Sequence, residues 1–462
     1  MSTKKDLVEA HSFNRRRLIT AFVSGAPGGR EVEPVRTGRT LVGGVVLAGL
    51  MVGGAAVTGL FADRTPEDWL DPGMVIGDES GSRFVALEGQ LYPVINTTSA
   101  RLLVDAASFE VRFVPDADIA GEDVQRAVGI VGAPDVLPAP ADLVQSGWAS
   151  CAQVGTADVR TTVDTESALT PSVDTGAVVT AGDGVHLISG SMRYAVPDGQ
   201  TGVAVLRELG LPPDPFEVSA DWLNLFPAGP DLVPESFFSL DVGDPPDPSV
   251  VGDLPASVRI GDVVAEGERR YIYTRTLVDG GVDEGLAELN PFADAVYRGL
   301  FGTDEVPVSA EEIRATPSAR APWSSTWPTA ALAPYGAETL CAHLETKEGT
   351  PAVVSLASVK EGREEAMVPS LGERSVQVAS GHGALVRGYG EAAVDAGQIH
   401  LIDSGGTRYP IGQPTPDQDL ERLGYAAEPV ASVPTAWMRL FPEGPVLSSE
   451  SAQVPLDEQG TS

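Results

Sequence analysis

One segment near the start of the chain is uniformly apolar, whereas the rest of the chain alternates between short apolar and polar runs. Residues 41–61 form a stretch of 21 residues without a charged side chain. A helix rises about 1.5 Å per residue, so this stretch would be about 30 Å long, which matches the apolar core of a bilayer. The pattern therefore predicts a transmembrane helix over residues 41–61.

The alternative for such a stretch is a cleaved signal peptide, which has a short charged region and about 7–15 apolar residues. Here the preceding region is 40 residues long, and Leu60-Phe61-Ala62 does not resemble a small-residue cleavage site. Residues 1–40 carry eight basic and four acidic side chains. Because positive flanks stay in the cytoplasm, we expect a single-pass plasma-membrane protein with its N-terminus inside and residues 62–462 outside.

Two glycines of this segment, Gly49 and Gly53, lie about one helical turn apart. Small residues at that spacing let two transmembrane helices approach closely, although Gly-rich spans are also common in such sequences. Residues 3–24 place apolar side chains among basic ones. That arrangement predicts a short amphipathic helix that lies on the inner leaflet or docks on a partner.

The outer region contains an internal repeat. Four blocks recur in the same order, 214 or 215 residues apart: 185–188 with 399–402, 193–194 with 408–409, 206–210 with 420–424, and 225–230 with 440–445. Each set predicts a strand, a turn, a strand and a helix, then a second helix that ends at a proline. The second helices carry Trp222 and Trp437, which we expect to lie in the cores of their repeats.

A weaker pair of repeats lies upstream of these two. One runs from a hairpin at residues 83–87 to Asn96 and a helix over 97–104, and the other runs from 270–273 to Asn290 and a helix over 291–300. Asparagine is a favoured N-cap residue and proline suits the first helical turn, which predicts that both helices begin directly after the asparagine. Residues 276–285 of the third repeat are interpreted as an enlarged turn.

The two cysteines, Cys151 and Cys341, fall between the repeats and are 190 residues apart, close to the separation of 194 residues between Asn96 and Asn290. They therefore occupy matching points of two copies, each built as unit, central segment and unit. Outside the membrane such a pair predicts a disulfide across a pseudo-two-fold axis, with two free buried thiols as the alternative. Closing so long a loop would stabilise the fold by at most about 5 kcal/mol.

Several of these features resemble the EccB family, the membrane components of the type VII (ESX) secretion system of actinobacteria. The resemblance rests on residues 4–5, 12–18 and 24–31, on the single span, on the four units and on the cysteine pair. It implies a core complex with EccC, EccD and EccE, and contacts outside the membrane with further copies and with the mycosin protease. EccC supplies the motor ATPase, although EccB proteins have also been labelled ATPases.

The expected architecture is therefore α+β: one N-terminal transmembrane helix and an elongated extracytoplasmic domain of four small α/β units around a central domain, duplicated about a pseudo-two-fold axis. The expected segments are a cytoplasmic basic segment (1–40), the transmembrane helix (41–61), a linker and unit 1 (62–120), a central segment with Cys151 (121–180), unit 2 (181–240), a linker and unit 3 (241–310), a central segment with Cys341 (311–395), unit 4 (396–447) and a C-terminal tail (448–462).

Charge and motifs limit the function classes. The 65 acidic residues outnumber the 31 basic ones, which argues against nucleic acid as a partner. No Gly-Lys pair is present for a Walker A loop, and the five histidines and two cysteines do not show metal-ligand spacing. His382, in Gly381-His382-Gly383, is the one histidine in a loop that would suit catalysis, but the sequence shows no catalytic partner for it.

We therefore expect no catalytic, cofactor-binding or metal-binding residues. The function that we expect is that of a structural subunit of the secretion membrane complex. The alternatives are a membrane-anchored nucleotide hydrolase, which a phosphate-release assay would detect, and a cell-wall binding module, which a glycan pull-down would detect.

Overall fold

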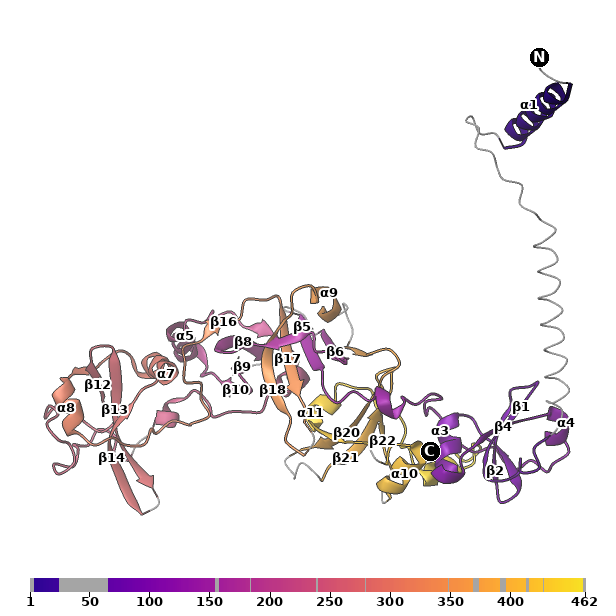
Figure 1. Ribbon diagram of the computed structural model, residues 1–462. Helices are drawn as coiled ribbons and strands as arrows, with labels where there is room; N and C mark the ends of the chain where they lie inside the picture. The colour runs from indigo at the N-terminus through magenta and orange to yellow at the C-terminus, as the bar shows by residue number, and fades with distance from the viewer. Residues whose placement is uncertain are drawn as a thin grey trace. The chain divides into compact units, whose positions relative to one another are not determined.

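The computed structural model describes residues 4–24, 65–153, 158–182, 184–237, 240–278, 280–347, 349–368, 374–390, 396–412, 415–426 and 428–459. The predicted span over 41–61, with Gly49 and Gly53, lies outside them. Among the described residues, no helix is both long enough and apolar enough to cross a bilayer. The chain divides into an N-terminal part, Met1–Pro66, and a main body, Glu67–Ser462 (Figure 1).

In the N-terminal part, the predicted helix over residues 3–24 is confirmed as α1 (Lys4–Ser24). Its large apolar side chains are exposed: Leu7, Val8, Phe13, Leu18, Ile19 and Phe22. So short a segment cannot bury a core of its own.

The main body is an α+β fold made of small sheets and short helices. Four of its sheets share one topology: a three-stranded antiparallel meander, a helix, and a fourth strand that pairs in parallel with the first, which gives the strand order 3-2-1-4. A parallel pair needs a crossover connection, and the helix provides it. A second short helix follows each fourth strand.

We call these four sheets and their helices units 1 to 4. Unit 1 comprises β1 (Gly73–Gly77), β2 (Arg83–Leu87), β3 (Gln90–Pro93), α3 (Thr97–Leu103), β4 (Val111–Val114) and α4 (Asp116–Ile119). Unit 2 comprises β8 (Thr175–Ala181), β9 (Gly184–Ser189), β10 (Met192–Ala195), α5 (Gly199–Glu208), β11 (Phe216–Glu217) and α6 (Ala220–Leu223); β16 (Ala333–Pro334) also pairs with β8.

Unit 3 comprises β12 (Val263–Glu266), β13 (Arg269–Val278), β14 (Gly281–Glu288), α7 (Pro291–Phe301), β15 (Val306–Pro307) and α8 (Ala310–Ala315). Unit 4 comprises β20 (Ala384–Tyr389), β21 (Gln398–Ile402), β22 (Arg408–Pro410), α10 (Pro416–Leu423), β23 (Ala431–Pro434) and α11 (Thr435–Met438). A short 3-10 turn, η1 (Ala106–Ser108), lies between α3 and β4 of unit 1. Outside the units and the central sheet lie the helix α12 (Ser449–Gln453) and the 3-10 turns η2 (Pro140–Asp142) and η3 (Pro234–Phe237).

The two predicted asparagine caps are confirmed. The Asn96 side chain accepts a hydrogen bond from the Ser99 amide at 2.8 Å, and the Asn290 side chain accepts one from the Ala293 amide at 2.9 Å. Pro291 occupies the first turn of α7. Each cap satisfies a backbone donor at a helix start, which is typically worth about 1 kcal/mol.

The prediction of an enlarged turn over 276–285 is wrong. Strands β13 and β14 continue through most of this stretch, from the pair Tyr271 and Glu288 to the pair Val278 and Gly281. Arg275 lies opposite Glu284 in the ladder and donates to it at 2.6 Å, while the Tyr273 hydroxyl donates to the same carboxylate at 3.0 Å. This partly buried ion pair explains why polar residues continue the hairpin instead of ending it.

The central sheet combines strands from both halves of the main body. Its order is β19-β6-β5-β17-β18-β7. The strands are β5 (Trp148–Gln153), β6 (Val159–Val163) and β7 (Leu169–Pro171) from the first half, and β17 (Thr339–Glu345), β18 (Val353–Val359) and β19 (Arg374–Val378) from the second. The first half contributes the neighbouring pair β5 and β6, and its third strand, β7, lies at the edge beside β18. The second half contributes the pair β17 and β18, and its third strand, β19, lies at the other edge beside β6. The helix α9 (Glu364–Met367) lies between β18 and β19 in the chain.

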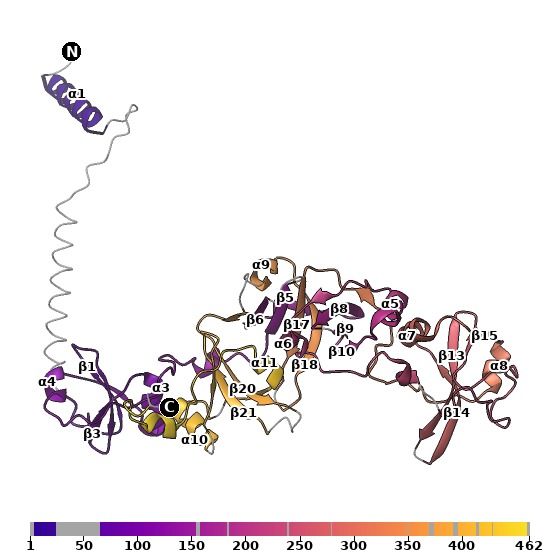
Figure 2. The ribbon, with the colours of Figure 1, turned by 180° about the vertical axis from the view of Figure 1, so that it is seen from behind.

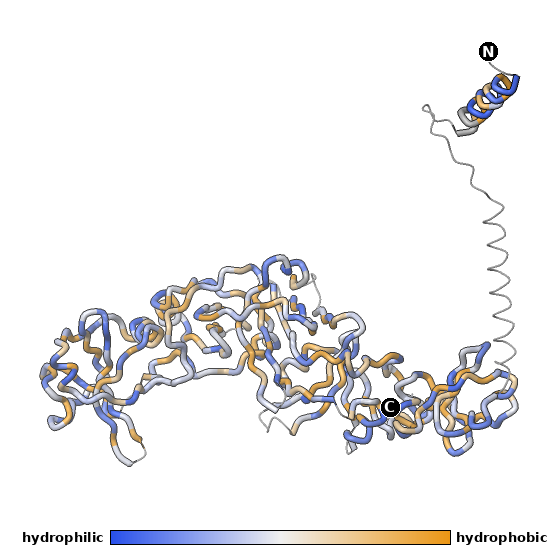
Figure 3. Tube along the Cα trace, in the orientation of Figure 1, coloured by the Kyte–Doolittle hydropathy of each residue, from blue (hydrophilic) through white to orange (hydrophobic). Residues whose placement is uncertain are grey.

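The units meet in two joints. In the unit 2–unit 3 joint, α5 packs on α7, and in the unit 4–unit 1 joint, α10 packs on α3 (Figures 1 and 2). Units 2 and 4 also pack on the central sheet, so we call them the inner units and call units 1 and 3 the outer units. Apolar positions recur at short intervals throughout the main body, as expected for several small cores (Figure 3).

Candidate functional site: the disulfide sheet and the inner units

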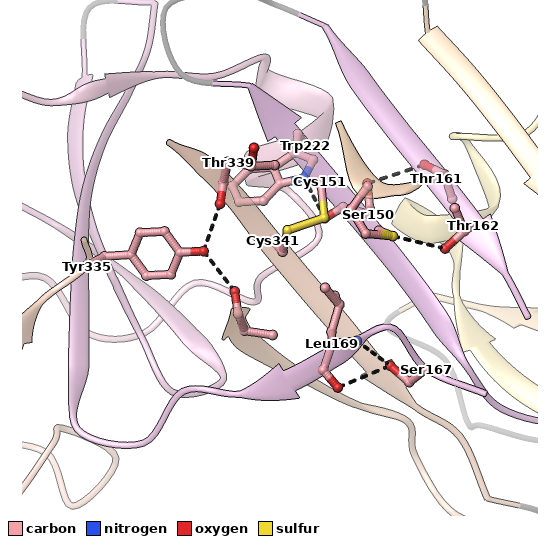
Figure 4. The surroundings of a disulfide bond; sticks show 12 residues. Ser150, Cys151, Thr161, Thr162, Ser167, Leu169, Trp222, Tyr335, Thr339 and Cys341 are labelled. Carbon is pink, nitrogen blue, oxygen red and sulfur yellow. Dashed lines mark hydrogen bonds between the residues drawn. A yellow bond between two sulfur atoms is a disulfide. The ribbon is translucent and has the colours of Figure 1, made fainter. Parts of the chain in front are cut away.

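The structure joins Cys151 to Cys341 by a disulfide (Figure 4). The two cysteines lie directly opposite each other on the neighbouring antiparallel strands β5 and β17, with their Cα atoms 4.1 Å apart. Both are fully buried, together with Leu169, Ala357 and Met367 on one face of the central sheet. The bond therefore links the two halves of the chain at the middle of the sheet that both halves build.

The opposite face of the central sheet receives the inner units. Successive side chains of a strand point to opposite faces, so Trp148 and Ala152 point away from the disulfide side, as do Leu340 and Ala342 of β17. They share one core with the second helices of units 2 and 4. This shared core fixes both inner units against a single sheet.

Trp222 and Trp437 are the central side chains of that contact, and both are fully buried. The Trp222 indole nitrogen donates to the Ser150 carbonyl at 3.2 Å, next to the disulfide (Figure 4). Trp437 lies in the same core, beside the edge-on pair of Trp148 and Phe441. The predicted repeat-core tryptophans therefore also anchor their units to the central sheet.

The outer units carry acidic residues at the matching position. Trp222 and Trp437 are the third residues after the helix N-caps Ser219 and Pro434, and the same count after Pro115 and Ser309 reaches Asp118 and Glu312. Asp118 is exposed, and Glu312 is half-buried. This position thus distinguishes the units whose second helix packs on the central sheet from the units whose second helix does not, because a carboxylate is costly to bury without a partner.

Units 2 and 4 repeat a second contact. In unit 2 the Gly229 amide donates to the Arg193 carbonyl at 2.7 Å, and in unit 4 the Gly444 amide donates to the Arg408 carbonyl at 2.8 Å. Each glycine lies against the ring of the tyrosine that follows the arginine, so that an added Cβ would come 2.6 Å from Tyr194 or 2.3 Å from Tyr409. A side chain does not fit there, which explains why both copies of the block keep glycine.

The histidines are packed or exposed without catalytic geometry. His186 and His400 lie on matching strands, and burial, followed by the nearby Arg193 or Arg408, lowers the pKa of each. Burial also lowers the pKa of His343, on β17. The half-buried His382 contacts the Ser380 carbonyl through its ring Nδ1 at 2.9 Å, a local turn contact. His11 lies on α1.

The described residues contain no group of three or more His, Cys, Asp or Glu side chains that could hold a metal ion. A charged cleft of about 410 Å³ lies at the unit 2–unit 3 joint. In it Asp294, whose pKa is raised by burial, lies within 3.7 Å of Arg270 and Arg298. These pairs neutralise one another and link α7 to the adjoining strand, so the arrangement is suited to holding elements together.

Some features of this site escaped the sequence prediction. The first strands of units 2 and 4 begin at Thr175 and Ala384, upstream of the residues 181 and 396 at which the sequence predicts those units. Both strands are partly buried, and their buried positions require only apolar character. The two strands therefore share no sequence block that could be recognised. The contrast between Trp222 and Asp118 could have been found by counting from the proline or serine before each second helix.

Comparisons with known proteins identify a matching family and several relatives. The family described as type VII secretion system ESX-1, transport TM domain B, matches residues 1–459. The ESX-3 secretion system ATPase EccB3 of Mycobacterium tuberculosis (strain ATCC 25618 / H37Rv) is 26% identical over 479 residues, covering 91% of this chain and 84% of the relative. The ESX-2 secretion system ATPase EccB2 of the same strain is 28% identical over 240 residues, covering 49% of this chain and 47% of the relative, so that match spans about half of the relative's length.

Solved structures show the same fold. A chain of an intact ESX-5 inner membrane complex has a TM-score of 0.63 at 22% identity and covers 98% of this chain and 95% of its own length. The EccB3 dimer from the ESX-3 core complex has a TM-score of 0.63 at 23% identity, covering 82% of this chain and 99% of that chain. With the family match over nearly its whole length, this chain belongs to the EccB family, transport TM domain B of the type VII secretion system.

Proposed function

We propose that this protein is a structural subunit of a type VII (ESX) secretion membrane core complex and supports protein export across the cell envelope. The observation that carries this proposal is the likeness in fold, over 98% of this chain, to a chain within an intact ESX-5 inner membrane complex. The site has the same character: a disulfide, two tryptophan anchors and glycine contacts serve packing.

The membrane topology is part of the proposal. Residues 41–61 form the single span, the N-terminus is cytoplasmic, and the main body is extracytoplasmic. The charge asymmetry around the span supports this orientation, and so does a disulfide in the main body, because such bonds persist in oxidising compartments. A reporter fused after Ser462 should be active only outside the cytoplasm, and cytoplasmic activity would contradict the orientation.

We also propose that the main body arose as two copies of one arrangement: an outer unit, central strands and an inner unit. Three observations support this: the shared 3-2-1-4 strand order, the equivalent caps Asn96 and Asn290, and the equivalent glycine contacts of units 2 and 4. The edge strands of the central sheet depart from symmetry, because β7 pairs antiparallel with β18 whereas β19 pairs in parallel with β6.

Assembly is the activity to be measured. The family resemblance suggests EccC, EccD and EccE-like subunits, a mycosin protease and further copies of this chain as partners. Deleting residues 1–40 should leave the main body folded but reduce co-purification of EccC and EccD. Replacing Gly49 and Gly53 with leucine should also reduce it, by widening the helix contact. Met51→Leu, about 200° around the helix from Gly49, is the matched control. Full recovery of both partners by both variants would contradict this route of assembly.

Nucleotide hydrolysis is the second candidate, because the curated relatives carry the word ATPase in their names. Phosphoryl transfer needs phosphate-binding donors and a bound divalent cation. This sequence has no Gly-Lys pair and a net charge of -34. Purified protein should therefore release no phosphate from ATP above a blank preparation. Release that survives repurification and is abolished by one point mutation would favour the hydrolase.

A further inference from the structure

The fourth strand of unit 1 forms an open sheet edge with exposed apolar side chains. Strand β4 is the last in the order β3-β2-β1-β4, so it has a neighbour on one side only. Val111 is 46% exposed and Phe113 is 62% exposed. They are two residues apart and therefore share one face. An edge strand with exposed apolar residues is a template for pairing with another strand.

The other three units do not present such an edge. The residue two positions before the N-cap of the second helix is Phe113 in unit 1, Glu217 in unit 2, Pro307 in unit 3 and Ser432 in unit 4. Glutamate is charged, proline lacks the amide that an added strand needs, and Ser432 is buried within unit 4. Phe216 in the edge strand of unit 2 packs against the core, so unit 1 is the unit whose edge strand carries an exposed aromatic side chain.

Charge around β4 limits what can be added. The Arg112 guanidinium contacts the carboxylates of Glu110 at 3.0 Å and Asp68 at 3.6 Å, which are 68% and 57% exposed. Asp116 and Asp118 follow the strand directly. The edge is therefore acidic overall. A second copy would bring the same acidic flanks together, and an anionic lipid surface would be repelled as well.

We propose that β4 is a docking edge for an extended segment of a partner protein, with apolar side chains at alternate positions and basic residues at its flanks. The segment would add as a fifth strand of the unit 1 sheet. Its backbone would pair with the outward amides and carbonyls of β4, and its apolar side chains would cover Val111 and Phe113. The inference rests on the proposed role in an assembly, because it requires a partner.

Hydrogen exchange can test this pairing directly. The purified full chain in detergent is compared with the purified core complex, and exchange is followed at the Val111 and Phe113 amides. We expect at least tenfold slower exchange at both amides in the complex. The Met74 amide, which donates to the Glu110 carbonyl inside the sheet at 2.8 Å, is the internal control and should be protected in both samples.

Three variants separate strand addition from other contacts. Phe113→Pro installs the residue that unit 3 has at this position, removes the outward amide and should lower partner recovery several-fold. Phe113→Thr keeps the amide and should lower it less. Glu110→Lys should weaken recovery by repelling basic flanks. Val173→Thr, at a position 79% exposed away from the edge, is the control and should have no effect.

The outcomes are distinguishable from failure of the proposed function. If the complex assembles but the Val111 and Phe113 amides exchange as fast as in the free chain, the docking edge is wrong and the role in the complex stands. Protection in the free chain that increases with its concentration would identify a second copy as the occupant and overturn the proposed partner. Stronger recovery with Glu110→Lys would overturn the basic character of the segment.

Discussion

The unit 2–unit 3 joint and the unit 4–unit 1 joint use equivalent helices but are closed by different chemistry. In the first, Phe237 contacts the rings of Tyr297, Phe301, Trp323 and Trp327, with centroids between 5.5 and 6.0 Å apart. In the second, the core is mostly aliphatic, and a C-terminal strap, residues 448–459, fastens unit 1 to unit 4.

The strap makes polar and backbone contacts. The Leu456 amide donates to the Ala127 carbonyl at 3.0 Å, the Gln459 side chain donates to the Gly129 carbonyl at 2.6 Å, and Arg126 pairs with Glu458 at 2.9 Å. The expected C-terminal tail is therefore, up to residue 459, an integral part of this joint. The difference shows that chain connection matters: units 2 and 3 follow one another in sequence, whereas units 4 and 1 must be brought together by the chain end.

The largest effect is expected when the C-terminal strap is removed. A chain that ends at Leu447 loses α12 and every strap contact to residues 126–129, so unit 1 should detach from unit 4. Limited proteolysis should then cleave the connection around residues 120–140 while unit 3 stays resistant. If unit 1 keeps its protection, the strap does not hold the joint.

The aromatic joint should be sensitive to one side chain. Phe237→Ala removes a buried ring and its contacts, which should destabilise the protein by about 3–5 kcal/mol. Unfolding in urea, monitored by tryptophan fluorescence, should report it because Trp323 and Trp327 lie in the cluster. Val242→Ala, at an exposed position upstream of unit 3, is the control.

A smaller effect is expected from the helix contact beside this cluster. An added Cβ at Gly299 in α7 would lie 2.4 Å from the Val205 Cα in α5. Gly299→Ala should therefore push the helices apart and destabilise the protein by about 1–3 kcal/mol. Gly302→Ala is not a suitable control because its φ is +97°. Ala295→Gly, also in α7, serves for comparison: it shows whether removing a methyl group destabilises the protein more than adding one at Gly299.

The smallest effect should be the pH dependence of stability, to which the matching histidines of units 2 and 4 should both contribute. The pKa values of His186 and His400 are lowered by burial, so the unfolded chain binds protons more readily than the folded one. The free energy of unfolding should fall as the pH drops below about 6.5. Urea midpoints at pH 7.5 and 5.5 should differ less in a His186→Gln/His400→Gln variant. Unchanged pH dependence in that variant would assign the effect to other groups, such as His343.

The sequence predicted what depends on local rules. Asn96 and Asn290 were identified as caps from their position before an apolar helix. The repeated blocks located strands at Arg193 and Arg408, and the glycine of the later block is kept because it packs against the tyrosine after each arginine. The pairing of Cys151 with Cys341 followed from their equivalent positions. These signals rest on geometry that few residue types satisfy.

What the sequence did not reveal depends on long-range packing. Phe237 is an ordinary apolar residue until the joint forms around it, and Gln459 has no local sign of binding the Gly129 carbonyl 330 residues earlier. The crossing of β7 and β19 to opposite edges of the central sheet likewise has no sequence motif. Residues 276–285 contain three acidic residues and three glycines, which favoured an enlarged turn in the sequence. The ladder continues through them because Glu284 pairs with Arg275 on the neighbouring strand.

The exchange of edge strands in the central sheet has a consequence for the order in which the protein can fold. During synthesis, β7 emerges long before its partner β18, and β5 waits 190 residues for β17. The first half of the main body must therefore persist with open strands until the second half arrives. Pairing so distant in sequence makes folding slow and exposes the nascent chain to misassembly. The Cys151–Cys341 bond can then form only after both halves of the main body have been synthesised and have paired.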